Sequence, residues 1–152
     1  MSPSCPSPPF LLDVMLGKLT TYLRMCGYDA AYGLDRGIED DDAVLALARR
    51  ERRTLVTRDR ELADRTDDGL LIESRDVPDQ LRELRAAGVD LTLDEPQRCS
   101  TCNRRLSQLP AGATTPNHVP DAADGVWQCV GCEQHFWRGS HWEDVADTLS
   151  SL

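Results

Sequence analysis

Four cysteines form two pairs of identical spacing, and they are the strongest chemical signal in the chain. The pairs are Cys99 with Cys102 and Cys129 with Cys132, and 26 residues (103–128) separate them. A two-residue gap lets both sulfurs of a pair turn toward one ion, so four such thiolates suit tetrahedral zinc. The long connection is tolerated because the entropy cost of closing a loop grows slowly with its length. We therefore expect a closed, structural zinc site.

Other uses of the cysteines fit this chain less well. Two disulfides would need an oxidising compartment, and the N-terminal residues lack the basic and apolar regions of a secretory signal. A redox pair is expected in an α/β region rather than in a segment rich in Gly and Pro. Cys26 is expected to be a buried core thiol, and Cys5 lies in a Ser/Pro-rich tail. The nearby His118, His135 and His141 are expected to pack or hydrogen-bond locally.

Acidic residues stand at three places where ligands gather in α/β proteins. Asp13 ends a predicted strand, Asp59 follows another, and residues 40–42 open a predicted helix. Carboxylates brought together repel one another unless a hard cation such as Mg²⁺ or Mn²⁺ neutralises them. Such a metal can activate water and stabilise charge on a phosphoryl group. The alternative is helix capping, by Asp41 or Asp42 and by Asp59 for a helix over 60–65.

Lys18 is conspicuous because it is the only lysine among 17 lysines and arginines. It follows Asp13 by five residues, which allows its side chain to approach the same edge of a sheet. A compact ammonium there can contact a phosphate, whereas the alternative is a solvated position on a helix surface. The chain has neither of the glycine-rich phosphate motifs GxxxxGK[ST] and GxGxxG, so a nucleotide cradle is not indicated.

The acidic composition of this chain indicates the salt content of its surroundings more than the charge of its binding partners. Its formal net charge is −9, and aspartate supplies 18 of its 26 acidic residues. Surplus carboxylate with little lysine predicts a halophilic protein adapted to a salty cytoplasm, although GC-rich codons also favour arginine. No apolar run approaches the ~20 residues of a membrane span. We expect a cytoplasmic protein with no membrane partner.

Short apolar strands alternate with amphipathic helices between residues 10 and 95, which indicates an α/β fold with a parallel sheet. The predicted strands are 10–14, 28–32, 54–57, 69–73 and 89–93. The predicted helices are 15–26, 43–51, 60–65 and 77–88, with a last helix at 143–149. The pattern breaks where the paired cysteines begin. We therefore predict a disordered tail at 1–9, an α/β domain at 10–95 and a cysteine-rich segment with a closing helix at 96–152.

Four blocks of this sequence together resemble a known family. They are FLLDVMLGKLTTYLRMCGYD, DDAVLALA…TLVTRDREL, CSTC…CVGC and FWRGSHWED. The chain resembles the Mut-seven C-terminal RNase domain family over roughly residues 10–145. The resemblance implies a PIN-like parallel sheet flanked by helices, followed by a small zinc ribbon. It also implies RNA as the partner, structural zinc, and catalytic Mg²⁺ or Mn²⁺.

The resemblance also implies roles for individual acidic residues. Asp13, Asp41 and Asp59 match the family's acidic positions and are expected to be catalytic and to hold the Mg²⁺ or Mn²⁺ ion. The register leaves Asp42 as an alternative to Asp41. A fourth acid is common in PIN-type sites, and Glu61 and Asp76 are the candidates here.

Basic and aromatic residues complete the expected site. Lys18 and Arg58 occupy motif positions expected to contact phosphate. Arg138 belongs to the family-typical segment WRGSHW, and we expect it to bind substrate as well. Trp137 and Trp142 of that segment either stack on bases or pack the ribbon against the main domain.

Three functions remain open from the sequence. The first is a metal-dependent endoribonuclease that cleaves RNA phosphodiesters. The second is a non-catalytic RNA-binding module, associated with the ribosome or its RNA. The basic run of Arg49, Arg50, Arg52 and Arg53 would then contribute, although it also fits a solvated helix end. The third is a toxin-like PIN protein with a protein antitoxin.

Overall fold

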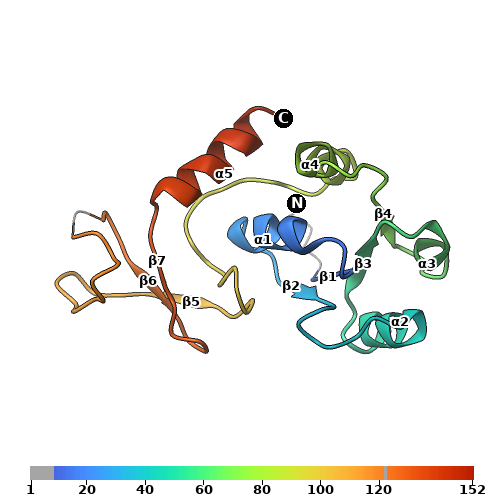
Figure 1. Ribbon diagram of the computed structural model, residues 1–152, viewed down its shortest axis with the longest axis horizontal. Coiled ribbons are helices and arrows are strands. Elements are labelled where there is room, and N and C mark those ends of the chain that lie inside the picture. The colour runs from blue at the N-terminus through green and yellow to red at the C-terminus, as the bar shows by residue number, and fades with distance from the viewer. Residues whose placement is uncertain (1–8, 122) are drawn as a thin grey trace, which may run out of the picture.

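The computed structural model describes residues 9–121 and 123–152, which form two sheets flanked by helices (Figure 1). A four-stranded parallel sheet has the order β2-β1-β3-β4, and a three-stranded antiparallel sheet has the order β5-β6-β7. The strands are β1 (Phe10–Leu12), β2 (Ala30–Tyr32), β3 (Thr54–Thr57), β4 (Leu70–Leu71), β5 (Leu106–Gln108), β6 (Trp127–Cys129) and β7 (His135–Phe136). The helices are α1 (Gly17–Met25), α2 (Asp41–Arg50), α3 (Arg60–Asp64), α4 (Val77–Ala86) and α5 (Ser140–Ser150).

Local sequence signals explain where several helices begin and end. The Asp40 side chain accepts a hydrogen bond from the Ala43 N–H at 3.2 Å and so caps α2. Pro78 lies in the first turn of α4, where its missing N–H costs nothing. Gly27 and Gly88 follow α1 and α4 with φ of +95° and +98°, the left-handed conformation that ends a helix.

The parallel sheet is covered on both faces. On one face, α1 and α4 pack over the sheet and α5 packs against this layer, and on the other face α2 and α3 cover the sheet (Figure 1). Strand β1 is buried on both sides: Leu12 belongs to the first cluster of apolar side chains and Leu11 to the second. Such two-sided burial is typical of the central strands of parallel sheets and explains the continuous apolar run at the start of the chain.

The prediction of a fifth strand at 89–93 is wrong, because these residues form no strand. Val89, Leu91 and Leu93 instead pack against the apolar cluster that α1 and α4 share. The Tyr28 hydroxyl donates to the Asp90 carbonyl at 2.8 Å and accepts from the Asp90 N–H at 3.0 Å. The alternating pattern therefore reflects one-sided contact with the core rather than strand pairing.

Other predicted bounds are close but not identical. Strand β4 has two residues where five were predicted at 69–73, and α5 is longer than the predicted 143–149. Val145 and Leu149 of α5 are buried in the cluster beneath α1 and α4. The closing helix thus packs on the α/β core, although the zinc ribbon precedes it in the chain. A boundary at residues 95–96 stays a prediction.

The first cysteine knuckle is attached to the outer edge of strand β2. Arg24 of α1 is 4% exposed; its Nε donates to the Ala30 carbonyl at 2.8 Å and its guanidinium also donates to the Ser100 carbonyl at 3.0 Å. The Asn103 side chain accepts from the Ala30 N–H at 2.9 Å and donates to Asp29 at 2.6 Å. These contacts occupy backbone groups that an edge strand would otherwise leave open.

In the described part of the chain, no helix is long and apolar enough to cross a membrane.

Candidate functional site

The four cysteine sulfurs converge as the spacing predicted. The four Sγ atoms lie within 4.8 Å of one another, with 3.6 Å between Cys99 and Cys132 and 3.3 Å between Cys102 and Cys129. Tetrahedral zinc with Zn–S bonds of ~2.3 Å places its sulfurs roughly 3.8 Å apart. The cluster therefore fits zinc in both ligand type and spacing, and all four corners are cysteine, as in structural sites.

Each knuckle is shaped by its own backbone. The Cys102 N–H donates to the Cys99 sulfur, and the Cys132 N–H donates to the Cys129 sulfur, both at 3.4 Å. Burial raises the pKa of Cys99 to about 12. Burial acts in the same direction on Cys129, but hydrogen bonds from the backbone of Cys132 and Gly131 outweigh it and lower the pKa of Cys129 to about 7. Part of the cluster is thus prepared to be thiolate, the form that binds metal.

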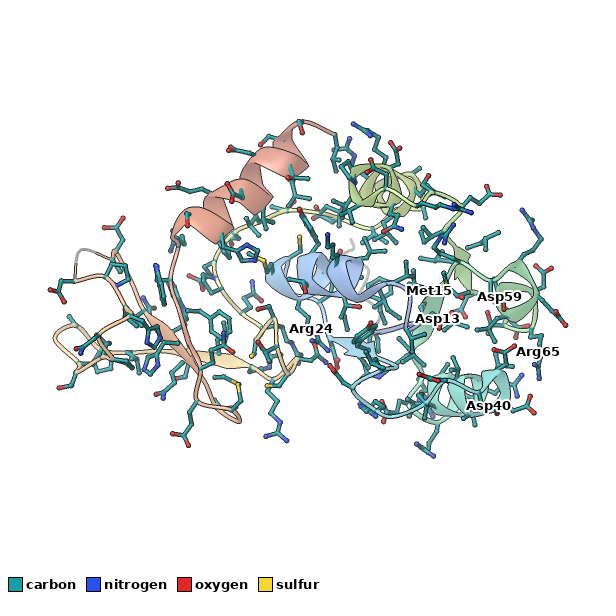
Figure 2. The ribbon with its side chains drawn as sticks, in the orientation of Figure 1. Asp13, Met15, Arg24, Asp40, Asp59 and Arg65 are labelled. Atoms are coloured by element: carbon teal, nitrogen blue, oxygen red, sulfur yellow. The ribbon has the colours of Figure 1, made fainter. Side chains whose placement is uncertain are left out.

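A buried threonine links two of the predicted acidic residues. Thr57, at the end of β3, is 0% exposed. Its hydroxyl donates to Asp13 Oδ2 at 2.8 Å and accepts from the Asp59 N–H at 3.0 Å. Because β1 and β3 are adjacent parallel strands, their carboxyl ends meet at one edge, and Asp13 and Asp59 both lie there (Figure 2). We call Asp13, Thr57 and Asp59 the acidic rim.

Both carboxylates of the rim also have structural contacts. Asp13 Oδ1 accepts from the Val14 N–H at 2.7 Å. Asp59 Oδ1 accepts from the Leu62 N–H at 3.2 Å, so Asp59 is the N-cap of α3, as the capping alternative predicted. Capping employs one oxygen of Asp59 and leaves the second carboxylate oxygen as a possible ligand.

The three aspartates at the start of α2, residues 40–42, have different contacts. Asp40 caps the helix, and Asp42 forms an ion pair with Arg65 at 2.7 Å. This hydrogen bond, together with the charges of Asp42, Asp41 and Glu61, raises the pKa of Arg65. Asp41 is exposed in the first turn of α2. The ion pair holds the start of α2 beside the end of α3 (Figure 2).

The three predicted metal acids do not form a closed cluster. Among residues 9–121 and 123–152, the cysteine cluster is the only group of three or more His, Cys, Asp or Glu side chains whose ligand atoms all lie within 4.8 Å. Asp13 and Asp59 share Thr57, whereas Asp41 stands on another element. Of the candidate fourth acids, Glu61 lies in the first turn of α3 and Asp76 begins α4.

The predicted phosphate contacts are distributed over the molecule. Lys18 is exposed in the first turn of α1 and lines a cleft of about 720 Å³ together with Arg75 and Asp76. The Nε of Arg58 is buried, and within the described residues it is the one buried side-chain nitrogen or oxygen without a hydrogen-bond partner. Arg138 lies on the ribbon, with its guanidinium carbon 5.3 Å from the ring centre of Trp127. Arg138 is thus not gathered with the acidic rim.

The remaining predicted side chains have local contacts. His118 lies 6.3 Å from His135 and 6.0 Å from Trp137 between ring centres, which agrees with local packing. Trp142 packs against the core beneath α1 and α4. Cys26 is partly buried against the same core, and burial raises its pKa to about 12. Of the predicted basic run, Arg53 is paired with Asp29 and Glu51, while Arg49, Arg50 and Arg52 are exposed.

Sequence reasoning missed three residues that organise these sites: Thr57, Arg65 and Arg24. Thr57 is the last residue of the predicted strand 54–57 and lies two residues before Asp59. This position was the available signal. Nothing in the sequence pairs Arg65 with Asp42, or Arg24 with the knuckle, because those partners are distant in the chain.

Comparison with known proteins places the chain in a family. No curated protein and no solved structure matches it. The model of the Mut7-C RNAse domain matches residues 8–149, nearly the whole chain, and it covers both the parallel sheet and the cysteine cluster. The chain therefore belongs to the Mut7-C RNAse domain family.

Proposed function

We propose that this protein is a metal-dependent endoribonuclease whose acidic rim holds Mg²⁺ or Mn²⁺. The observation that carries the proposal is the Thr57 hydroxyl, which joins Asp13 and Asp59 at the carboxyl ends of neighbouring strands. Membership of an RNAse domain family supports RNA as the substrate class. Ligands in open α/β sheets bind at this edge, so the rim lies where a substrate is expected.

The rim fits a magnesium-like ion by its donors. Mg²⁺ is usually bound by one or two carboxylates, with waters and substrate phosphates as the other ligands. Asp13 and Asp59 supply two such carboxylates, and the exposed Asp41 would join them by reorienting its side chain. Asp41 is the better candidate in its run because Asp40 caps α2 and Asp42 pairs with Arg65. Bound there, the ion would activate water and offset phosphate charge.

Residues of this chain would then position the RNA backbone. Arg58 directly precedes Asp59 and is partly exposed, so it would contact a phosphate beside the rim. Lys18 lies in the first turn of the helix that follows Asp13 and would contact a neighbouring phosphate from the cleft it lines. Thr57 is a positioning residue because it acts through the two aspartates.

The test is cleavage of single-stranded and structured RNA by the zinc-loaded chain with Mn²⁺ or Mg²⁺. Asp13→Asn and Asp59→Asn should each lower the cleavage rate by about 100-fold or more, because each removes a charged ligand. Asp79→Asn is the matched control, since Asp79 is an exposed carboxylate on α4 that pairs locally with Arg82. Equal cleavage by the wild type and Asp13→Asn would exclude the acidic rim as the source of activity.

A second candidate, a non-catalytic RNA-binding module, is favoured by one observation. The carboxylates of Asp13, Asp41 and Asp59 are not among the described groups whose ligand atoms lie within 4.8 Å. This candidate predicts that the zinc-loaded chain retains RNA without added Mg²⁺ or Mn²⁺ and cleaves none when either is supplied. RNA cleavage that disappears in Asp13→Asn rules it out.

A further inference from the structure

A cavity lies where the ribbon meets the α/β core, away from the acidic rim. Its volume is about 270 Å³, and its lining comes from the end of α1, the first knuckle, strands β5 and β7 and the start of α5. Figure 1 shows where these elements lie. Met25, Phe136, Trp137 and Trp142 contribute apolar and aromatic surface to the lining. Neither the zinc cluster nor the proposed nuclease chemistry employs these four side chains.

The lining combines aromatic rings with polar groups. Arg98, Gln134 and His141 line the cavity beside the two indoles. Aromatic surface next to donors and acceptors suits a flat heterocycle with polar edges, and it suits a purely aliphatic group less well. Nucleobases have this combination, and every base offers a face on which an indole can stack.

The backbone at the cavity is adapted to one of its indoles. A Cβ atom at Gly139 would lie 2.6 Å from Nε1 of Trp137, so any other residue there would displace the indole. The position of the Trp137 indole therefore depends on the absence of a side chain at Gly139. Arg98 is also held, because its guanidinium donates to the Asn103 carbonyl at 3.0 Å. Gly139 thus leaves room for one indole of the lining, and a backbone hydrogen bond holds Arg98.

Charge around the cavity differs from that of the chain as a whole. Residues 96–152 contain four arginines and six acidic residues, whereas residues 1–95 contain 13 lysines and arginines and 20 acidic residues. Arg98 lies in the lining itself and adds a permanent positive charge to it. A polyanion is therefore repelled less by this region than by the rest of the surface.

The cavity and the acidic rim lie at opposite ends of one helix. Asp13 precedes the start of α1, and Met25, its last residue, lines the cavity. A helix of nine residues is roughly 13 Å long. Figure 2 shows Asp13 at the end of α1 that points away from the ribbon. An RNA strand that reaches both places must span at least this distance.

We propose that this cavity binds one unpaired base of the RNA substrate, with Trp137 and Trp142 as stacking surfaces and Arg98 and His141 beside the base edge and its phosphate. This inference rests on the proposed function for the identity of the ligand. A protein segment is the other occupant that an apolar cavity allows. RNA is favoured because the family is one of RNases and because residues 96–152 are less acidic than residues 1–95.

The test measures binding of a fluorescently labelled single-stranded RNA dodecamer to the full, zinc-loaded chain. All variants carry Asp13→Asn as a common background so that the RNA is not cleaved. Trp142→Leu and His141→Ala should each weaken the affinity, by about 5- to 100-fold for the tryptophan. Asn117→Ala is the control, because Asn117 is an exposed ribbon residue outside the cavity lining.

Two further measurements identify the ligand group and check the fold. AMP should quench the tryptophan fluorescence of the wild type, whereas ribose 5-phosphate, which lacks a base, should not. Circular dichroism and zinc content establish that each variant is folded. Because Trp142 also packs on the core, His141→Ala decides alone if Trp142→Leu fails to fold.

The outcomes separate this inference from the proposed nuclease function. Unchanged RNA affinity in folded Trp142→Leu and His141→Ala overturns the inference, even if the wild type cleaves RNA. Equal quenching by AMP and ribose 5-phosphate overturns it too, because the cavity would then read phosphate alone. Loss of affinity in both variants supports the inference even if the wild type cleaves nothing, in which case only the nuclease proposal fails.

Discussion

The cysteine cluster and the acidic rim are two sites built in opposite ways. The cluster is assembled from two knuckles, and in each knuckle the chain turns both sulfurs inward over four residues. The rim is assembled from strands β1 and β3, which meet only because the sheet places them side by side. Its third predicted member, Asp41, comes from the start of a helix and stays outside the group.

The difference shows what each site depends on. Four cysteines at knuckle spacing have one common chemical use in a reducing compartment, and local backbone geometry already aims their sulfurs. Aspartates have several uses, and here the same run of them includes a helix cap and an ion pair. The role of a carboxylate is therefore decided by its neighbours, and the role of a knuckle cysteine mainly by its spacing.

Removal of zinc should have the largest effect and should fall mainly on the ribbon. Cys102→Ser breaks the cluster, and binding of structural zinc contributes on the order of 10 kcal/mol to the folding of small zinc domains. We expect the ribbon to unfold and residues 103–128 to become sensitive to proteolysis. Zinc content per chain and limited proteolysis measure this.

The control for zinc removal is Cys26→Ala, which changes a cysteine outside the cluster. It should retain a full complement of zinc. A Cys102→Ser chain with a protease-resistant ribbon would contradict a structural zinc site.

Arg24 connects the first cysteine knuckle to strand β2 of the parallel sheet. Its removal should therefore destabilise both the ribbon and the α/β core. Arg24→Met keeps the apolar stem but leaves the carbonyls of Ala30 and Ser100 without their donor. We expect a loss of about 3 kcal/mol in the free energy of unfolding, as for other broken buried charge networks. Urea unfolding measures it, with Arg82→Met as the control on the surface of α4. A loss no larger than that of the control would show that the regions fold independently.

Thr57 tests how far the acidic rim depends on one hydroxyl. Thr57→Val keeps the shape of the side chain but removes the donor to Asp13 and the acceptor of the Asp59 N–H. We expect RNA cleavage to fall by about 10-fold as the carboxylates lose their positions, with about 1–2 kcal/mol lost from the free energy of unfolding.

The conservative variant Thr57→Ser retains the hydroxyl and should rescue most of the activity. Initial cleavage rates at saturating Mn²⁺ distinguish the three proteins. Wild-type rates in Thr57→Val would mean that the two aspartates are positioned by other contacts.

Acid titration should give the smallest effect, in the α/β region. Hydrogen bonds from Arg36 and Arg53 lower the pKa of Glu51 to about 2. Because the folded pKa lies below the ordinary value of 4.5, Glu51 contributes stability above pH ~4.5 and loses it as the pH falls toward 2. Glu51→Gln should therefore reduce the melting temperature at pH 7 but not at pH 2. The loss of zinc at low pH is expected in both the wild type and Glu51→Gln, so it cancels when their melting temperatures are compared. Glu39→Gln is the control, because Glu39 is exposed.

The sequence predicted the fold class well and individual elements less evenly. The apolar runs at β1 and β3 and the capped helix α2 were predictable because burial and capping leave local patterns. The segment 89–93 has the same alternation as a strand, yet it lies along the core without a partner strand. An alternation of apolar and polar residues indicates that one side of a segment is buried. It does not indicate whether a neighbouring strand or another element buries it.

For the sites, the sequence by itself determined that the four cysteines converge and that Asp13 and Asp59 follow strands. The reason is that ligand spacing and strand ends are local properties of the chain. Only the tertiary structure decided that Thr57 joins those aspartates and that Arg65 engages Asp42. It also decided that α5 returns to the α/β core and leaves a cavity beside the ribbon. These contacts join residues on different elements, and packing alone brings such residues together.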